Sequence, residues 1–207
     1  MTVVADLGQG LTGIRSTTPD SLVLDVGILY ANVDLAALRA AGSGQLAAAV
    51  ASAILLGATR GGANWETGRV IRQIPVDGKR YNIKGLARVE KYEPKLKVSL
   101  IEITAGNMKR SLVPLTEATY TAFTELSTSL TVTNGSYLTN LCLVTTITGH
   151  TDPIIFVLEN AMASTNQAFK LEDMNELVME TEFHGYADPA TPTTSPARIF
   201  YPLPAAS

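Results

Sequence analysis

The 207-residue chain has few of the residues on which metal and redox sites depend. It contains one cysteine and two histidines. The single cysteine, Cys142, excludes an intrachain disulfide, and its apolar neighbours predict a buried small side chain rather than a nucleophile. His150 and His184 have no second histidine or cysteine at ligand spacing, so we predict no metal site.

Motifs of the common enzyme classes are also missing. The chain has no Gly-x-Ser-x-Gly run and no phosphate-binding Gly-x-x-x-x-Gly-Lys run. Gly8, Gly10 and Gly13 have the spacing of a dinucleotide-binding loop, but Pro19 follows too soon for the helix that would hold a pyrophosphate. Glu180 and Glu182 share one face of one expected strand, whereas glycosidase carboxylates flank the bond that they cleave. We therefore expect no enzymatic activity and no cofactor.

Long apolar runs and a surplus of basic charge are absent as well. The most apolar stretch, 46–56, is alanine-rich and too short to span a bilayer, and no signal peptide is expected, so we predict synthesis in the cytoplasm without membrane insertion. A net charge of −3 gives no electrostatic basis for tight nucleic-acid binding. Only 17% of the residues are charged, which indicates that other subunits cover part of the surface; an ordinary low-charge β domain is the alternative.

Strand-length segments separated by turns fill most of the sequence. They predict one mainly β domain over 1–207, a sandwich or barrel of two packed antiparallel sheets flanked by one α-helix. The expected strands are 21–33, 69–74, 79–83, 86–92, 95–100, 129–133, 137–148, 154–158, 177–183 and 198–203.

The best-marked helix follows Thr104, a suitable N-cap residue. Met108 and Leu112 share one face of this helix, and Pro114 ends it.

Three further segments have weaker signals. A turn or two of helix is expected within 34–44. The alanine-rich segment 45–58 fits close packing in the core or a subunit contact, with core packing slightly favoured. Segment 115–126 combines apolar residues at helical spacing with threonines that favour strand, and we interpret it as a weak helix.

Turn and arm signals complete the outline. Asp77-Gly78 and Asn134-Gly135 each predict a hairpin between flanking strands. Residues 1–20 lack periodicity and predict an N-terminal arm, and 58–80 predict a protruding loop or hairpin. Residues 188–207 predict a proline-rich extended connector, a last strand and a C-terminal tail.

An ordered set of short runs lies between residues 55 and 112, in the order strand, glycine-rich loop, hairpin, two strands and helix. The runs are Leu56-Gly57-Ala58-Thr59-Arg60-Gly61-Gly62, Arg72-Gln73-Ile74-Pro75-Val76-Asp77-Gly78, Lys84-Gly85 and Leu100-Ile101-Glu102-Ile103-Thr104. Two weaker runs follow, Phe183-His184-Gly185-Tyr186-Ala187-Asp188 and Pro196-Ala197-Arg198-Ile199-Phe200. Together they resemble the major tail, or tail tube, proteins of long-tailed bacteriophages.

The resemblance implies a structural virion protein with a β-sandwich or barrel beside a helix. Six such subunits form a ring, and rings stack into a hollow tail tube around the tape measure protein. DNA passes transiently through the tube at ejection. The implied partners are other copies of the chain, the tape measure protein, a tail terminator and baseplate or tip proteins, with assembly in the host cytoplasm.

Matched position by position, 58–62 and 65–73 form the family's inter-subunit loop and 104–113 its flanking helix, whereas 115–134 follow the family pattern poorly. The candidate inter-subunit residues are Arg60, Gly61, Gly62, Trp65, Glu66, Arg69 and Arg72. Glu180 and Glu182 are candidates for the lumen, because an acidic or neutral lining repels phosphate.

Three alternatives remain. A tube subunit of a bacterial secretion or contractile injection system has the same physics. A monomeric β-barrel binding protein needs a roomy apolar interior and leaves the arms without a role. A hydrolase is the least favoured because a nucleophile and base are missing.

Overall fold

A computed structural model describes residues 18–40, 44–164, 169, 171 and 173–203. Most of the predicted N-terminal arm, including Gly8, Gly10 and Gly13, and the end of the predicted C-terminal tail lie outside these residues. The described chain is mainly β and its sheets are antiparallel, which confirms the predicted class.

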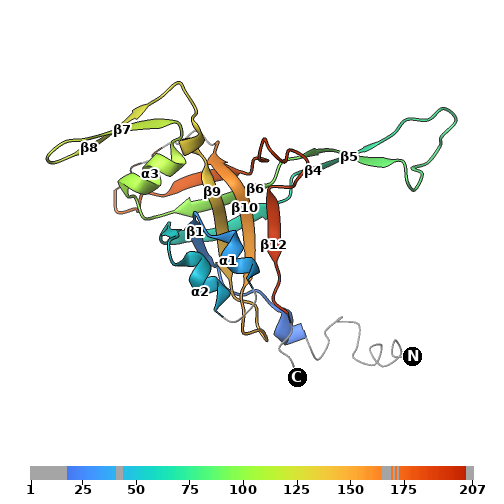
Figure 1. Ribbon diagram of the computed structural model, residues 1–207, viewed down its shortest axis with the longest axis horizontal. Coiled ribbons are helices and arrows are strands. Elements are labelled where there is room, and N and C mark those ends of the chain that lie inside the picture. The colour runs from blue at the N-terminus through green and yellow to red at the C-terminus, as the bar shows by residue number, and fades with distance from the viewer. Residues whose placement is uncertain (1–17, 41–43, 165–168, 170, 172, 204–207) are drawn as a thin grey trace.

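The body consists of two antiparallel sheets that share one long strand (Figure 1). Sheet A has the order β2 (Ile54–Leu55), β1 (Ile28–Ala31), β9 (Leu138–Thr145), β10 (Ile154–Ala163) and β12 (Ala197–Phe200). Sheet B continues from the end of β10 through β11 (Met179–His184), β6 (Lys95–Leu100) and β3 (Thr59–Glu66). Residues 155–158 of β10 pair with β12, whereas Met162 and Ala163 pair with β11.

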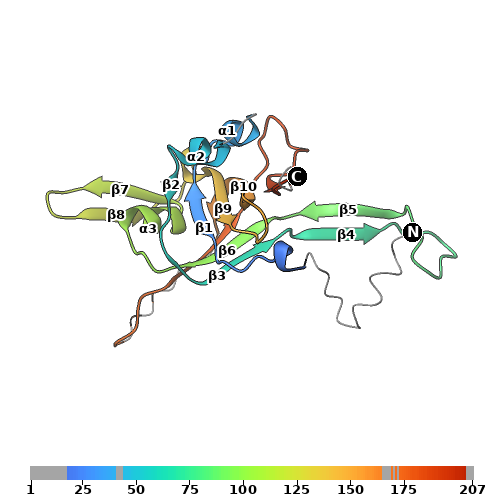
Figure 2. The ribbon, with the colours of Figure 1, turned by 90° about the horizontal axis from the view of Figure 1, so that it is seen from below.

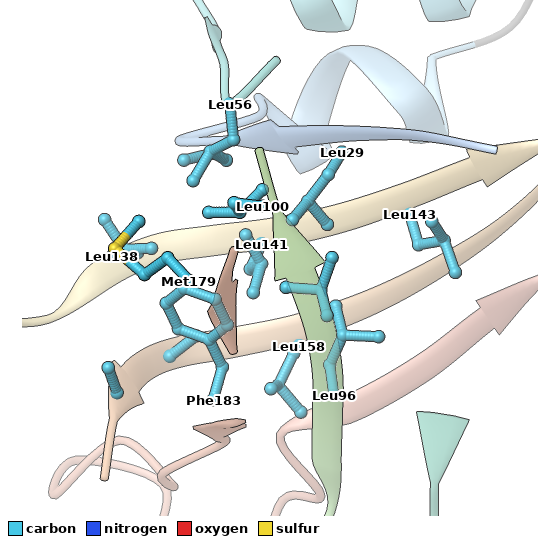
Figure 3. Close-up of a cluster of buried hydrophobic side chains, with 14 residues drawn as sticks. Leu29, Leu56, Leu96, Leu100, Leu138, Leu141, Leu143, Leu158, Met179 and Phe183 are labelled. Atoms are coloured by element: carbon cyan, nitrogen blue, oxygen red, sulfur yellow. The ribbon is translucent and has the colours of Figure 1, made fainter. Parts of the chain in front are cut away.

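The main core fills the space between the two sheets. Leu96, Val98 and Leu100 alternate with polar residues along β6 and are buried, as the period-two pattern predicts. They meet buried side chains from β1, β9, β10 and β11, and Figure 3 shows side chains of this cluster converging. The labelled residues are Leu29, Leu56, Leu96, Leu100, Leu138, Leu141, Leu143, Leu158, Met179 and Phe183.

A second cluster covers the outer face of sheet A. Helices α1 (Leu35–Arg39) and α2 (Gln45–Val50) lie on this face, where Leu35 and Ala49 belong to one buried cluster with Cys142 of β9 and Val157 of β10. β10 is therefore buried on both faces over 154–158, and Cys142 is buried, as predicted. For segment 45–58, core packing was the slightly favoured prediction. Ala49 does pack in the core, and it lies in helix α2. α1 confirms the turn or two of helix expected within 34–44, whereas α2 is a helix that was not expected.

Helix α3 (Ala105–Ser111) is the predicted flanking helix. Thr104 is its N-cap, and the Thr104 hydroxyl accepts a hydrogen bond from the Asn107 backbone N–H at 3.1 Å. The buried Asn107 amide donates to the carbonyl oxygens of Leu56 at 2.8 Å and Glu102 at 3.0 Å. Met108 packs against the main core. These contacts fix α3 to the start of β3 and the end of β6.

Two hairpins project from opposite sides of the body (Figures 1 and 2). The first joins β4 (Arg69–Gln73) to β5 (Ala87–Tyr92), and the second joins β7 (Leu115–Thr119) to β8 (Thr124–Thr128). The second hairpin shows that the helix predicted over 115–126 is wrong. β-branched Thr116, Thr119 and Thr124 favour strand, and the Thr116 hydroxyl bonds across the pair to Ser127.

The two predicted tight hairpins are also wrong in their pairing. Asp77-Gly78 does form a turn, in which the Lys79 N–H donates to the Val76 carbonyl oxygen at 3.2 Å, but β4 pairs with 87–92 and not with 79–83. Asn134-Gly135 begins the 3-10 helix η3 (Asn134–Ser136), and 129–133 form no strand. The Ser136 hydroxyl accepts a hydrogen bond from the Thr133 N–H, so local bonds replace a strand ladder there.

Two extended segments are shorter than expected. Within the predicted strand 21–33 only Ile28–Ala31 is strand, after the 3-10 helix η2 (Thr18–Ser21). The segment 188–196 is not an extended connector, because it forms consecutive turns. The Thr191 N–H donates to the Asp188 carbonyl oxygen, and the Thr194 N–H donates to the Thr191 carbonyl oxygen. Threonine and aspartate favour such local turns over extended structure.

Candidate functional site

The hairpin 69–92, called the finger below, leaves the body at a constrained glycine. Gly68 has a φ of +55°, and the Glu93 N–H donates to the Gly68 carbonyl oxygen at 3.0 Å. A Cβ on Gly68 would lie 1.9 Å from the Glu93 carbonyl oxygen. Only glycine fits this close crossing of the two chains, so the finger has a defined base.

The strands of the finger bury little against the body. Ile71 and Val89 lie directly opposite one another across the hairpin, and their side chains are 50% and 57% exposed. The other exposed large apolar residues of the finger are Val70, Ile74, Val76, Tyr81, Ile83 and Tyr92. A two-stranded ribbon is marginally stable in water by itself, and exposed apolar patches mark interaction surfaces. The finger therefore has the features of an element that is completed by a partner.

The finger also has the opposite charge to the rest of the molecule. It contains seven basic and two acidic residues, so its formal charge is +5, whereas the whole chain has a charge of −3. The basic residues are Arg69, Arg72, Lys79, Arg80, Lys84, Arg88 and Lys91. Such a separation of charge favours contact between the finger and an acidic surface.

The outer face of sheet B has a ladder of ion pairs. Lys97 lies 3.3 Å from both Glu66 of β3 and Glu182 of β11, and Glu182 also lies 3.1 Å from Lys95 and 2.8 Å from His184. Burial by itself would raise the pKa of the Glu182 carboxyl, but hydrogen bonds from Lys95, His184 and Lys97 outweigh it and lower the pKa to about 2. The face is therefore charged but largely self-compensated.

A hollow of about 460 Å³ lies on this face beside a bulge in β3. Between Thr59 and Ala63 the strand has two more residues than β6 opposite, and Gly61 and Gly62 have φ values of +76° and +87°. The hollow is bounded by both glycines and by Glu180 and Glu182. The glycines of β3 and the glutamates of β11, which are far apart in the sequence, are thus neighbours on one surface.

The remaining predicted contact residues fall in three places. Arg60 forms an exposed ion pair with Glu176 at 2.9 Å. Trp65 is half-buried against the main core, and its ring centroid lies 5.6 Å from that of Phe156. The indole ring therefore contributes to the packing of the fold. Arg69 and Arg72 lie on the finger. The protruding element accordingly spans 69–92, and 59–66 of the predicted 58–80 segment belong to sheet B.

Sequence reasoning missed the far part of the finger. Tyr81 is 84% exposed between Arg80 and Asn82, and the basic residues Lys84, Arg88 and Lys91 follow it. The signal was present as a local excess of basic residues in an otherwise acidic chain, which the total charge of −3 conceals.

Within the part of the chain that the structure describes, no three histidine, cysteine, aspartate or glutamate side chains gather as a metal site would require. Over the same ranges, helices long and apolar enough to cross a bilayer are absent. Burial raises the pKa of the Cys142 thiol to about 12, which keeps it protonated and unreactive near neutral pH.

Comparison with known proteins gives no relative: the chain matches neither a protein-family model nor a curated protein.

Proposed function

We propose that this chain is the self-assembling subunit of a hollow protein tube, the tail tube of a long-tailed bacteriophage. The observation that carries the proposal is the finger, a projecting two-stranded element with exposed apolar side chains and a charge opposite to that of the body. The resemblance of 56–62, 72–78 and 100–104 to tail tube proteins supplies the identity of the tube.

The contacts in such an assembly are heterologous, because the finger of one copy meets a different surface on the next. Heterologous contacts close into rings or continue as filaments, which is what a tube of stacked rings requires. The open edges of the sheets add a second mode of contact. β3 borders sheet B and β2 borders sheet A, and exposed edges of this kind pair with strands of other chains.

The outer face of sheet B suits the lumen of a conduit. Its charged residues Glu66, Lys95, Lys97 and Glu182 are paired with one another, so few basic groups remain to hold a phosphate backbone. With Glu180 the face is slightly acidic. Transit of DNA along such a surface is not slowed by specific binding.

Two other assignments are less well supported. A tube subunit of a secretion or contractile injection machine has the same surfaces, and only the sequence resemblance favours the phage tail. A binding protein with a ligand inside its barrel is disfavoured, because buried leucines with Met179 and Phe183 fill the space between the sheets (Figure 3).

The proposal is tested by the assembly state of the purified full chain. Sedimentation velocity over a range of protein concentrations, with negative-stain electron microscopy of the same samples, should show rings or tubes above a threshold concentration. A particle that stays monomeric at every concentration would overturn the proposal.

A further inference from the structure

An apolar cavity of about 420 Å³ opens at the end of the body, between the segment before β1, the start of α2 and the turn from β9 to β10. We call it the turn pocket. Its size is in the range that bound groups occupy. Its apolar lining residues are Ile28, Leu46, Val144, Ile147 and Pro153.

Two carboxylates, Asp25 and Asp152, stand among the residues that line this apolar floor. Asp25 accepts a hydrogen bond from the Thr146 hydroxyl, and within the described ranges neither aspartate forms an ion pair. Both are exposed. In contrast, Glu182 on sheet B already has Lys95 and Lys97 as partners. The carboxylates of the turn pocket, unlike Glu182, are therefore available to pair with basic side chains of another molecule.

Apolar surface continues outside the turn pocket. Leu24 and Val26 are 72% and 54% exposed and flank Asp25 in the chain. The surface therefore combines a cavity, an apolar border and unpaired carboxylates. An occupant of matching chemistry has one exposed aromatic or apolar side chain with basic residues around it.

The tip of the finger has this composition. Tyr81 is preceded by Lys79 and Arg80 and followed by Lys84. The tip of the second hairpin does not: Phe123 is 79% exposed, but the acidic Glu117 and Glu125 lie on its two strands. Charge thus discriminates between two aromatic hairpin tips of the same chain.

We propose that the finger tip of one copy docks in the turn pocket of a second copy, with Tyr81 against the apolar floor and Lys79, Arg80 and Lys84 facing Asp25 and Asp152. The inference rests on the proposed function and names the surface that receives the finger. Aromatic side chains in desolvated pockets carry much of the energy of protein interfaces, and the surrounding charges set the register.

Disulfide trapping tests the pairing directly, because the chain's own Cys142 is buried and unreactive. The variants Asn82→Cys, at the exposed position next to Tyr81, and Thr151→Cys keep Tyr81 and all five charged residues of the proposed contact. Mixed under mild oxidation, they should give a covalent heterodimer within the assemblies, since a disulfide forms only when the two Cα atoms approach within about 7 Å. The matched control, Phe123→Cys with Thr151→Cys, should give none.

Charge reversal gives an independent readout. Lys79→Glu with Arg80→Glu should raise the concentration at which assembly begins by about tenfold or more, as should Asp25→Lys with Asp152→Lys. When the two variants are mixed, each finger meets a pocket of opposite charge on a copy of the other variant. Assembly from alternating copies should therefore begin at the wild-type concentration. Far-ultraviolet circular dichroism and thermal melting of each variant establish that the body is folded.

The outcomes separate this inference from the proposed function. Wild-type tubes with a trapped Phe123→Cys pair, or without any trapped pair, overturn the docking site and leave the tube assignment standing. A chain that never assembles removes both.

Discussion

Gly68 is the residue at which the direction of the finger is set. Its positive φ and the Glu93 carbonyl oxygen leave no room for a side chain. Gly78, in the turn near the finger tip, has a similar φ of +78° but open space around it. Substitution of Gly78 therefore introduces backbone strain alone, whereas substitution of Gly68 introduces both strain and steric overlap.

We expect Gly78→Ala to cost about 1–2 kcal/mol in local strain, the usual price of a left-handed alanine. Gly68→Ala should cost more, because the Glu93 backbone must also move, and it should displace the finger and impair assembly. Urea unfolding and the assembly threshold of both variants check this. Equal behaviour of the two variants would contradict the proposed role of Gly68.

Asn107 is the polar residue that ties α3 into the body. Its buried amide satisfies the carbonyl oxygens of Leu56 and Glu102. Asn107→Ala should destabilise the chain by about 2–4 kcal/mol, because two hydrogen bonds are lost and two acceptors lose a donor. The N-cap variant Thr104→Ala, with an expected loss of about 1 kcal/mol, provides a scale in the same unfolding experiment. A smaller loss for Asn107→Ala than for Thr104→Ala would show that α3 is held in another way.

Glu182 makes stability depend on acid in a defined window. Its pKa is lowered from 4.5 to about 2 in the folded chain, so the ionised carboxylate stabilises the fold fully above pH 4.5. This stabilisation is lost as the pH falls from 4.5 through about 2. Glu182→Gln should therefore cost about 1 kcal/mol near pH 7, a modest figure because the side chain is 22% exposed, and very little once the pH is below 2. Unfolding free energies of both proteins across this range check the prediction, and a pH-independent difference would contradict it.

At the scale of elements, the finger tip should be separable from the body. Replacing 74–86 by Asn-Gly would join β4 to β5 through a tight turn and remove Tyr81 with three basic residues. We expect the thermal midpoint to change little and assembly to be abolished, because the removed residues have few contacts with the body.

The control shortens the other hairpin in the same way, with Asn-Gly in place of 120–123 between β7 and β8. This variant should still assemble through its finger. Electron microscopy of the two shortened proteins decides which hairpin is needed, and tubes from the finger variant would contradict its proposed role.

The elements that the sequence predicts well are those whose burial is local and regular. β6 was expected over 95–100 and is observed at those residues, since Leu96, Val98 and Leu100 alternate with Lys95, Lys97 and Ser99. Thr104 and Pro114 likewise bracket α3. The alternation in 177–183 similarly places Met179, Thr181 and Phe183 inward on β11.

The elements that it predicts poorly are those that the body does not bury. In β7–β8 the spacing of Leu115, Ala118 and Leu126 suggested an apolar helical face, but the hairpin points away from the core and its threonines decide the structure. The partner of β4 was misplaced because the Asp77-Gly78 turn is only one corner of a longer tip. Of the candidate site, the glycine bulge and Glu180 and Glu182 were identifiable as residues, but their proximity depends on strand order, which local patterns do not encode.

At the scale of the whole molecule, the separation of charge predicts a dependence on salt. The finger has a formal charge of +5, which leaves −8 for the remainder of the chain. Attraction between a finger and another body should weaken as the screening length falls from about 10 Å at 0.1 M salt to about 3 Å at 1 M.

We therefore expect the assembly threshold to rise with sodium chloride concentration, while the thermal midpoint of the monomer changes little. Light scattering across a salt series measures the threshold. The double variant Lys79→Glu with Arg80→Glu should show a flatter salt dependence than the wild type. A wild-type threshold that falls as salt is added would indicate apolar contacts alone.

The sharing of β10 between the two sheets has a mechanical consequence. In the proposed tube, bending or pulling would apply shear to the subunits, and in a sandwich of two separate sheets only side-chain packing resists sliding of one layer over the other. Here one strand, β10, pairs with β12 in sheet A and then with β11 in sheet B, so a single continuous backbone belongs to both layers. Displacing one layer therefore requires the ladder bonds of β10 to break together, so the body should transmit tension as one stiff block while the hairpins flex.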